Sequence, residues 1–300
     1  MLFNFMSTPP VCNYEGSDYQ ASFWEKGGRS YEDAVEAIAL KRLLPQQGRL
    51  LLELGAGAGR NTPRYQGFER VVLLDYSLTQ LEQAQQRLGS DNRYIYVAAN
   101  IYRLPFVAGL FDAATMIRTL HHMVEPELAL NQVYYVLGPG AAFILEYASK
   151  QNLKAIIRYW LHRQQWNPFS PETVEFTQLN FDFHPAQIRR WLKSQGFEIH
   201  RQLTVSHFRL GFLKRWVPLS LLTRMDAAAQ LTGGWWQLTP SVFVQASVSG
   251  PKLRAEPEAF FRCPACGSNL PELSEELACP GCGKHWPFEG GIYDFREKTP

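Results

Sequence analysis

The glycine-rich stretch that follows the first apolar run constrains the fold more than any other part of this sequence. Leu51-Leu52-Glu53-Leu54 is typical of a short buried strand, and it runs directly into Gly55-Ala56-Gly57-Ala58-Gly59. Glycines at alternate positions tolerate positive φ and let a ligand touch the backbone. A helix that begins after such a turn points its first N–H groups at that ligand. The pattern therefore predicts a ligand site where a strand turns into a helix.

The spacing of this stretch separates two kinds of nucleotide cofactor. A dinucleotide fingerprint requires Gly-x-Gly-x-x-Gly, whereas here Gly59 comes one residue early and Arg60 stands in its place. Glu53 offers a carboxylate that suits the ammonium group of an amino acid rather than a pyrophosphate. Asp75 lies twenty residues after Gly55 and ends the next apolar run, where a carboxylate can accept both hydroxyls of a ribose.

Strand-like and helix-like segments alternate through the first half of the chain. The expected strands are residues 49–54, 70–75, 93–98, 111–117 and 141–147, and the expected helices are residues 31–44, 77–88 and 125–137. Buried apolar strands that alternate with helices indicate an α/β fold with a doubly wound, mostly parallel, Rossmann-like sheet. Such sheets bind ligands beyond the carboxyl ends of their strands.

The next stretch, residues 150–216, is basic and rich in aromatic residues, with eleven Lys and Arg against four Asp and Glu. We interpret it in part as an inserted helical cap that holds an anionic or aromatic acceptor, or nucleic acid. A solvated cationic face over an apolar core explains the same composition. Within and after it we expect helices at 184–196 and 210–231 and strands at 197–205 and 241–249. The amphipathic segment 210–231 also suits a membrane surface and a lipid-like acceptor.

Four of the five cysteines lie close together near the carboxyl end. Cys263 and Cys266 form one Cys-x-x-Cys pair, and Cys279 and Cys282 form a second pair after twelve residues. Two such pairs complete a tetrahedral zinc site, and a unit of about fifty residues needs metal to supply its folding free energy. A linker beginning at residue 250 therefore predicts a large domain over residues 1–250 and a zinc ribbon over residues 251–300. All four ligands are used, so the zinc is expected to be structural.

The glycine turn and its carboxylates resemble those of class I S-adenosylmethionine-dependent methyltransferases, and most closely the broad type 11 group. The resemblance covers residues 12–250 and includes Ala99-Asn100-Ile101-Tyr102-Arg103-Leu104-Pro105-Phe106, where the family usually has Asp at Asn100. It implies that the glycines pass under the methionine, that Glu53 meets its amino group, that Asp75 holds the ribose and that Tyr76 lies against the adenine. The cofactor-binding residues it implies are Glu53, Gly55, Ala56, Gly57, Gly59, Asp75, Tyr76, Asn100, Ile101 and Arg118.

In this family the segment Ile117-Arg118-Thr119-Leu120-His121-His122-Met123 lies beside the transferable methyl group. The Pro-Pro motif used to grip amide and adenine nitrogens is absent, which disfavours those acceptors. The resemblance points to His121 and His122 as catalytic candidates, because histidine can take a hydroxyl proton near neutral pH. His121 is preferred, since it comes earlier out of the strand; a helix cap or packing role is the alternative. Tyr19 and Trp24 are candidates to close over the sulfonium through cation–π attraction, with a simple packed arm as the alternative.

The terminal unit resembles the small zinc-ribbon activator proteins that pair with RNA and release-factor methyltransferases. The resemblance rests on the two cysteine pairs and on Trp286-Pro287-Phe288-Glu289-Gly290-Gly291-Ile292. It implies that the unit stabilises the enzyme by covering an apolar edge, here within one chain.

Together these patterns predict S-adenosylmethionine-dependent methyl transfer to O, C or N of a small-molecule or lipid-like acceptor, with bound zinc. RNA or protein as the acceptor is one alternative, and a non-catalytic regulator that uses the ribbon to bind a partner is another. The net charge of +2 disfavours a strong overall attraction to nucleic acid or membrane. No apolar run reaches 18 residues and no signal-peptide pattern is found, so we expect a cytoplasmic protein without a transmembrane segment, with peripheral membrane contact compatible.

Overall fold

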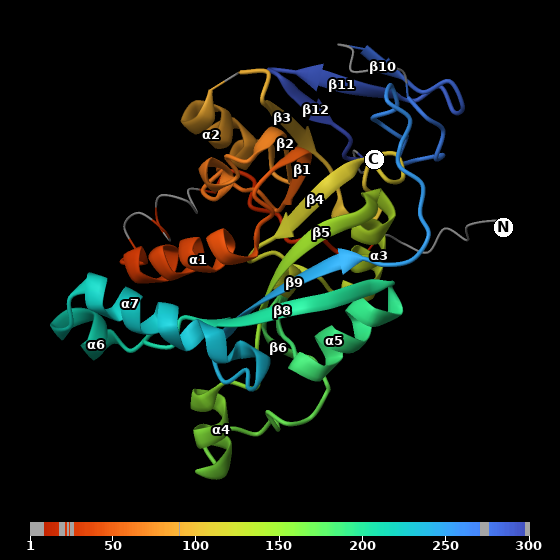
Figure 1. Cartoon of the computed structure of the whole chain (residues 1–300). Coiled ribbons are helices and arrows are strands. Elements are labelled where there is room, and N and C mark those ends of the chain that lie inside the picture. Colours follow the sequence, from red (N-terminus) through yellow and green to blue (C-terminus); the bar gives the residue numbers. More distant parts are fainter. Residues whose placement is uncertain are drawn as a thin grey trace.

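The computed structural model describes residues 9–17, 22, 24, 27–89, 91–270 and 276–297. Its centre is a ten-stranded sheet with helices on both sides (Figure 1), in the order β10-β11-β12-β3-β2-β1-β4-β5-β9-β8. The strands of this sheet are β1 (Gly48–Leu54), β2 (Phe68–Asp75), β3 (Tyr94–Ala98), β4 (Phe111–Met116), β5 (Leu137–Ala148), β8 (Phe197–Val205), β9 (Ser241–Val248), β10 (Glu276–Ala278), β11 (His285–Glu289) and β12 (Ile292–Asp294).

The helices connect the strands, and a separate hairpin forms a second small sheet. The α-helices are α1 (Ser30–Leu43), α2 (Leu78–Leu88), α3 (Pro126–Val136), α4 (Leu153–Trp160), α5 (Pro185–Ser194), α6 (Gly211–Trp216) and α7 (Leu219–Ala229). The 3₁₀ turns are η2 (Thr62–Arg64), η3 (Ile101–Arg103), η4 (Leu120–His122) and η5 (Gln230–Gly234), and the hairpin strands are β6 (Val174–Thr177) and β7 (Asn180–Asp182).

The middle of the sheet is parallel, as the apolar runs predict. β1 pairs in parallel with β2 on one side and with β4 on the other. Its residues Leu50–Leu54 are buried without interruption, because helices cover both faces of a parallel sheet. β9 runs antiparallel to its neighbours β5 and β8, and at the other end of the sheet β11 runs antiparallel to β10 and β12. The doubly wound, mostly parallel fold is confirmed, and it brings the carboxyl ends of β1, β2 and β4 to one edge.

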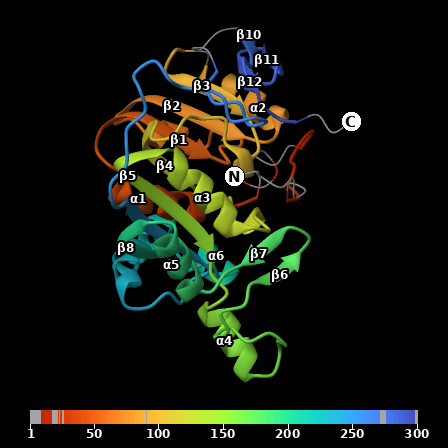
Figure 2. The ribbon, with the colours of Figure 1, turned by 90° about the vertical axis from the view of Figure 1, so that its right-hand side faces the viewer.

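The second half of the chain differs from the prediction in one helix and adds elements that the pattern missed. The single helix expected over 210–231 is wrong: α6 ends at Trp216 and α7 begins at Leu219. Val217 and Pro218 have extended ψ angles of 130° and 137°, because proline disfavours the helical region for the residue before it. α4 and the β6–β7 hairpin stand off from the sheet (Figure 2), whereas α5 and β8 of the expected cap belong to the sheet layers.

The carboxyl-terminal residues continue the sheet instead of forming a core of their own. β12 pairs in parallel with β3, placing Ile292 opposite Tyr96 and Asp294 opposite Ala98. Phe261 and Trp286 belong to the same buried cluster as the side chains of β1, β4 and β5. The β3 edge of the sheet is thereby covered. Within the described part of the chain, no helix combines the length and the apolar character needed to cross a membrane.

Candidate active site

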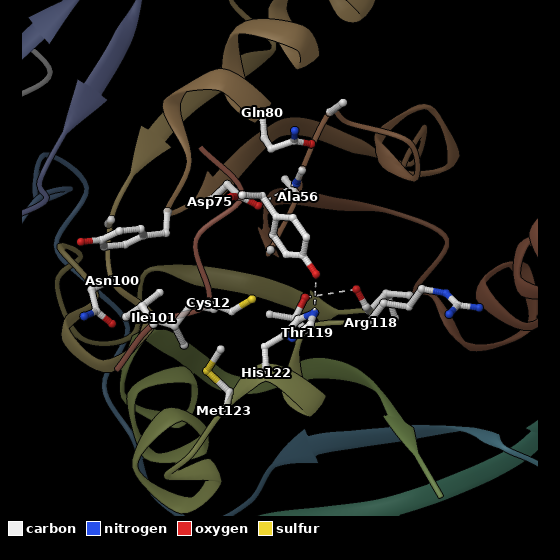
Figure 3. A pocket seen from close by; sticks show the side chains of 18 of the residues that line it. Cys12, Ala56, Asp75, Gln80, Asn100, Ile101, Arg118, Thr119, His122 and Met123 are labelled. Carbon is white, nitrogen blue, oxygen red and sulfur yellow. Dashed lines mark hydrogen bonds between the residues drawn. The ribbon is translucent and has the colours of Figure 1, made fainter. Parts of the chain in front are cut away.

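A cavity opens at the carboxyl ends of β1, β2 and β4, between the glycine turn and η4. Figure 3 shows Ala56, Asp75 and Gln80 on one side of it and Thr119, His122 and Met123 on the other. Nine of the predicted site residues line it, namely Gly55, Ala56, Gly57, Asp75, Tyr76, Asn100, Ile101, Arg118 and His122. Three others, Glu53, Gly59 and His121, are not on its wall.

Two positions of the glycine turn have no room for a side chain, so only glycine fits there. Gly55 has φ of +67°, and a Cβ there would lie 2.1 Å from Oγ1 of Thr119. Gly59 has φ of +70°, and a Cβ there would lie 2.8 Å from Leu88. The N–H groups of Gly55 and Ala56 both donate to the Leu74 carbonyl, over 2.8 and 3.0 Å. The turn therefore stays against β2 and presents backbone to the cavity.

Asp75 links the end of β2 to the glycine turn. Its Oδ2 accepts a hydrogen bond from Gly57 N over 2.8 Å, and its Oδ1 accepts one from Ser77 N over 3.0 Å. Burial raises the pKa of this carboxyl, although the hydrogen bonds from Ser77 and Gly57 act in the opposite direction. Each carboxylate oxygen has a further lone pair, so the group can hold the turn and still accept hydroxyl groups from a ligand.

Glu53 lies behind the turn, inside the fold. Its Oε2 accepts from Thr62 Oγ1 over 2.6 Å and its Oε1 accepts from the Tyr65 hydroxyl over 3.2 Å. Burial raises the pKa of Glu53 to about 7. The side chain is 4% exposed, so in this arrangement it orders η2 rather than forming part of the cavity wall.

His122 is the histidine that faces the cavity. Its Nδ1 lies 2.9 Å from the Leu179 carbonyl, which can only accept, so Nδ1 carries the proton. Nε2 is then the acceptor, and it lies 3.1 Å from the Tyr14 hydroxyl. Burial lowers the pKa of His122. The sequence favours His121, but His121 is not on the cavity wall. Its ring lies beside that of His122, with the two ring centroids 4.1 Å apart.

Trp24 lines the cavity, but its faces are occupied by the protein's own cations. The guanidinium of Arg60 lies 3.6 Å from its ring centroid and that of Arg118 lies 4.8 Å away. Both arginines also pair with the buried carboxylate of Glu36. Burial works to raise the pKa of Glu36, but Arg118 and Arg60 hold it below its ordinary value. Tyr19, the other aromatic candidate, lies outside the described residues.

The amino-terminal arm and the carboxyl terminus meet at the cavity rim. Glu15 accepts hydrogen bonds from Leu78 N over 3.0 Å and Thr79 N over 3.2 Å at the start of α2. Arg296, two residues after β12, lies 3.4 Å from Glu15 and donates to the Tyr76 carbonyl over 3.2 Å. Burial works to raise the pKa of Glu15, but the bonds from Thr79 and Leu78 and the charge of Arg296 lower it.

Sequence reasoning missed these rim residues and several residues of the wall. The missed wall residues are Val11, Cys12, Tyr14, Ala58, Arg60, Asn61, Gln80, Ala99, Tyr102, Ile117, Thr119 and Met123. Most stand beside a predicted residue in the sequence, so neighbourhood to the motifs could have found them. The sequence gives no comparable indication that Arg296 contacts Tyr76, because the two residues are 220 positions apart in the chain.

The four predicted cysteine ligands come together at the β10–β11 end of the sheet. All four Sγ atoms lie within 4.8 Å of one another, with Cys263 to Cys282 at 3.8 Å and Cys266 to Cys279 at 3.3 Å. Zinc bound tetrahedrally at about 2.3 Å from each sulfur separates the sulfurs by about 3.8 Å. The donor set and its spacing therefore fit one zinc ion with no open coordination position.

The fold and the site define a Rossmann-like class of enzyme in which a glycine turn after β1 and an acid after β2 hold a nucleoside-bearing cofactor. A methyltransferase domain family model matches residues 52–145. The chain is 30% identical over 186 residues to demethylmenaquinone methyltransferase of Clavibacter sepedonicus, covering 57% of this chain and 76% of that protein. It is 32% identical over 140 residues to the O-methyltransferase cnsE of Penicillium expansum, covering 43% of this chain and 51% of that protein.

Solved structures show the same fold. A structure of the Haloferax volcanii Trm112 methyltransferase activator in complex with a methyltransferase contains a chain that matches with a TM-score of 0.54 and 15% identity, covering 77% of this chain and 96% of that chain. An S-adenosylmethionine-dependent methyltransferase of Listeria monocytogenes matches with a TM-score of 0.52 and 16% identity, covering 73% of this chain and 99% of that one. The chain belongs to the S-adenosylmethionine-dependent methyltransferase family, and it is an enzyme of that class.

Proposed function

We propose that this methyltransferase acts on a hydroxylated, lipid-like small molecule, at oxygen or at a carbon activated by the hydroxyl. The observation that carries the proposal is the His122–Tyr14 pair, which faces the cavity opposite Asp75 and the glycine turn. In this proposal the pair supplies a proton acceptor beside the molecule to be methylated. The name of the Clavibacter relative, a demethylmenaquinone methyltransferase, supports a lipid-soluble aromatic acceptor.

The cofactor residues are assigned by their place in the cavity. Asp75 would accept the ribose hydroxyls, and the backbone of Gly55–Gly57 would lie along the methionine part. Tyr76, Asn100 and Ile101 would surround the adenine; the Asn100 side-chain oxygen already accepts from Tyr102 N over 2.9 Å. Bound S-adenosylmethionine supplies a methyl group activated by its sulfonium. Arg118 closes the acceptor side, and Glu53 supports the site from behind.

His122 serves as the general base in this proposal. Its protonated Nδ1 is fixed on the Leu179 carbonyl, so Nε2 is free to receive the acceptor's hydroxyl proton in place of the Tyr14 bond. The acceptor's oxygen or conjugated carbon then takes the methyl group, and the electron pair of the broken bond stays on sulfur. When carbon is methylated, the hydrogen on that carbon leaves as a proton and the oxygen regains one, which restores the ring. Since burial lowers the pKa of His122, the imidazole is neutral and ready to accept a proton at neutral pH.

The test is transfer of labelled methyl groups from S-adenosylmethionine to demethylmenaquinone and to a water-soluble catechol. We expect His122→Gln to lower kcat by about 10²-fold or more without changing the affinity for S-adenosylmethionine. His200→Gln, at an exposed position on β8, is the matched control. Full kcat in His122→Gln would refute the base assignment, and a larger loss in His121→Gln would transfer the role to that residue. Methylation of neither acceptor would refute the acceptor class.

We also propose that Cys263, Cys266, Cys279 and Cys282 hold one structural zinc ion. The support is the sulfur spacing between the two Cys-x-x-Cys pairs, 3.3 Å from Cys266 to Cys279 and 3.8 Å from Cys263 to Cys282. Elemental analysis of the purified protein is expected to give about one zinc per chain. Absence of any bound metal in protein purified without chelators would refute the assignment.

A further inference from the structure

The exposed apolar side chains of this enzyme are gathered on one part of the molecule. Among the described residues, eighteen large apolar side chains are exposed, and all but Leu128 and Leu253 lie between residues 153 and 238. Four are tryptophans: Trp160 ends α4 and Trp216 ends α6, with exposures of 68% and 78%, and Trp235 and Trp236 follow η5, with exposures of 82% and 55%. Solvent-exposed aromatic residues on neighbouring elements mark an interaction surface. We call the exposed residues of α4, α6, α7 and the η5 turn the aromatic face.

The helix α4 is apolar on the side that it turns to solvent. Leu153, Ile157, Trp160 and Leu161 are all exposed and share one face by their spacing, whereas only Ala155 and Ile156 of the helix are buried. A helix packed on a protein core normally has the opposite arrangement.

The helices α6 and α7 repeat this arrangement. Leu213 and Leu222 pack inward, while Phe212, Trp216 and Leu221 face solvent with exposures of 62%, 78% and 48%. Several helices therefore contribute to the exposed apolar surface.

The aromatic face is also the positive part of the chain. Residues 150–171 contain four Lys and Arg and no acid, and residues 206–240 contain four Lys and Arg and one acid, the buried Asp226. These segments together carry a formal charge of +7, while the whole chain carries +2, which leaves −5 for the rest. Arg209 and Lys214 pair with Glu32. Within these two segments, the exposed cations are Lys154, Arg158, Arg163, Arg215 and Arg224, and none of them pairs with an acid of another described residue.

The aromatic face is connected to the His122 side of the cavity through the β6–β7 hairpin. α4 begins five residues after the end of β5, and its Leu153 N donates to the Leu238 carbonyl over 2.8 Å, which joins it to the η5 turn. The β6–β7 hairpin follows α4 and supplies the Leu179 carbonyl that holds His122. Figure 1 shows α4, α6 and α7 beyond the end of the sheet toward which the β4 arrow points. The hairpin that follows α4 is thus in direct contact with His122.

We propose that the aromatic face docks on the surface of an anionic lipid bilayer. Tryptophan and leucine on a cationic helical surface enter the headgroup region, and nearby Lys and Arg attract acidic lipids. This proposal rests on the proposed function. It accounts for how a lipid-soluble acceptor reaches an enzyme whose cavity lies at the carboxyl ends of the strands. Binding itself requires neither cofactor nor acceptor and can be measured without them.

The test is co-sedimentation of the full chain with vesicles of phosphatidylcholine alone and of phosphatidylcholine with phosphatidylglycerol. We expect binding to the anionic vesicles that weakens as salt is raised. Arg215→Gln with Arg224→Gln should weaken it by roughly thirtyfold, at about fivefold per charge. Trp216→Ala with Trp235→Ala should weaken it by at least about tenfold. The matched controls Arg49→Gln, at the start of β1, and Leu253→Ala, both at exposed positions outside the face, should bind like the unmodified chain.

Several outcomes overturn the proposal. Absence of binding to both vesicle types does so, as does equal weakening by the control variants. Salt-sensitive binding to RNA with no vesicle binding would assign the face to nucleic acid, and a dimer that Trp216→Ala dissociates would assign it to a second copy of the chain. Vesicle binding without methylation of any lipid acceptor would retain the docking surface and refute the acceptor class, so the two failures are distinguishable.

Discussion

Aromatic side chains are buried at one end of the sheet and exposed beyond the other. At the end of the sheet formed by β10, β11 and β12, Phe261, Trp286 and Phe295 are at most 2% exposed and pack with ring centroids 4.8 to 5.5 Å apart. Beyond the β8 edge, Trp160 and Trp216 are 68% and 78% exposed. Both regions contain aromatic residues, so burial distinguishes how these residues are used. Aromatic residues in the terminal unit stabilise the fold, whereas those of the aromatic face leave apolar surface for another molecule.

The largest predicted effect concerns the metal at the terminal edge. Cys279 is 2% exposed and belongs to the main buried cluster. Cys279→Ser should release the zinc and lower the free energy of unfolding by more than about 4 kcal/mol, because metal and core are lost together. Zinc content and chemical denaturation measure this. Cys12→Ser, which lies at the cavity, should retain the zinc. Normal zinc content in Cys279→Ser would show that the cysteines do not form the site.

The second prediction compares one aromatic residue from each edge. Phe261 is fully buried and stacks on Phe106 at 5.8 Å, so Phe261→Ala should lower the free energy of unfolding by about 3–5 kcal/mol. Trp216→Ala should change it by less than about 0.5 kcal/mol. Denaturant unfolding of the two variants gives both values. Equal losses would remove the distinction between the edges.

The third prediction concerns Asp182, on the hairpin at the cap side. Burial, with help from Glu146, raises the pKa of Asp182 to about 7. The folded protein therefore binds this proton more tightly than the unfolded chain, and the resulting stability is complete below about pH 4 and is lost as pH rises through about 7.

Between pH 5 and pH 8 this loss should reach about 2 kcal/mol. Asp182→Asn should remove that part of the slope in a series of unfolding measurements across pH. Glu289→Gln replaces an exposed carboxyl at the terminal edge and serves as the control. An unchanged slope in Asp182→Asn would mean that the hairpin carboxyl titrates alike in both states.

The smallest predicted effect tests whether the terminal edge also serves catalysis. Arg296 joins β12 to the Tyr76 carbonyl and to Glu15 of the arm. Arg296→Gln should raise the KM for S-adenosylmethionine by about threefold to tenfold, while kcat and the free energy of unfolding change little, since one part-exposed pair is weak. Arg296→Lys should recover part of the loss. A change in kcat alone, or no change in KM, would contradict a positioning role.

Local patterns predicted the middle of this molecule well, because its strands obey a local rule. The strand over 70–75 and the turn at Gly55–Gly59 follow from apolar runs and from glycines that need positive φ. Local patterns did not indicate that His122, rather than His121, lines the cavity. Side-chain direction at the end of a strand depends on η4 and on Leu179, a residue 57 positions away. The break at Pro218 was available from the sequence, since proline marks such ends.

The sequence by itself determined the parallel sheet, the ligand turn with its following acid, and the four-cysteine cluster, because each depends on residues close together in the chain. Only the tertiary structure decided that β12 extends the sheet beside β3, that Arg296 reaches the cofactor rim, and which aromatic side chains are buried. Periodicity specifies which side of an element is apolar. Whether that side meets the core or the solvent depends on contacts between distant segments, and these form only when the whole chain is folded.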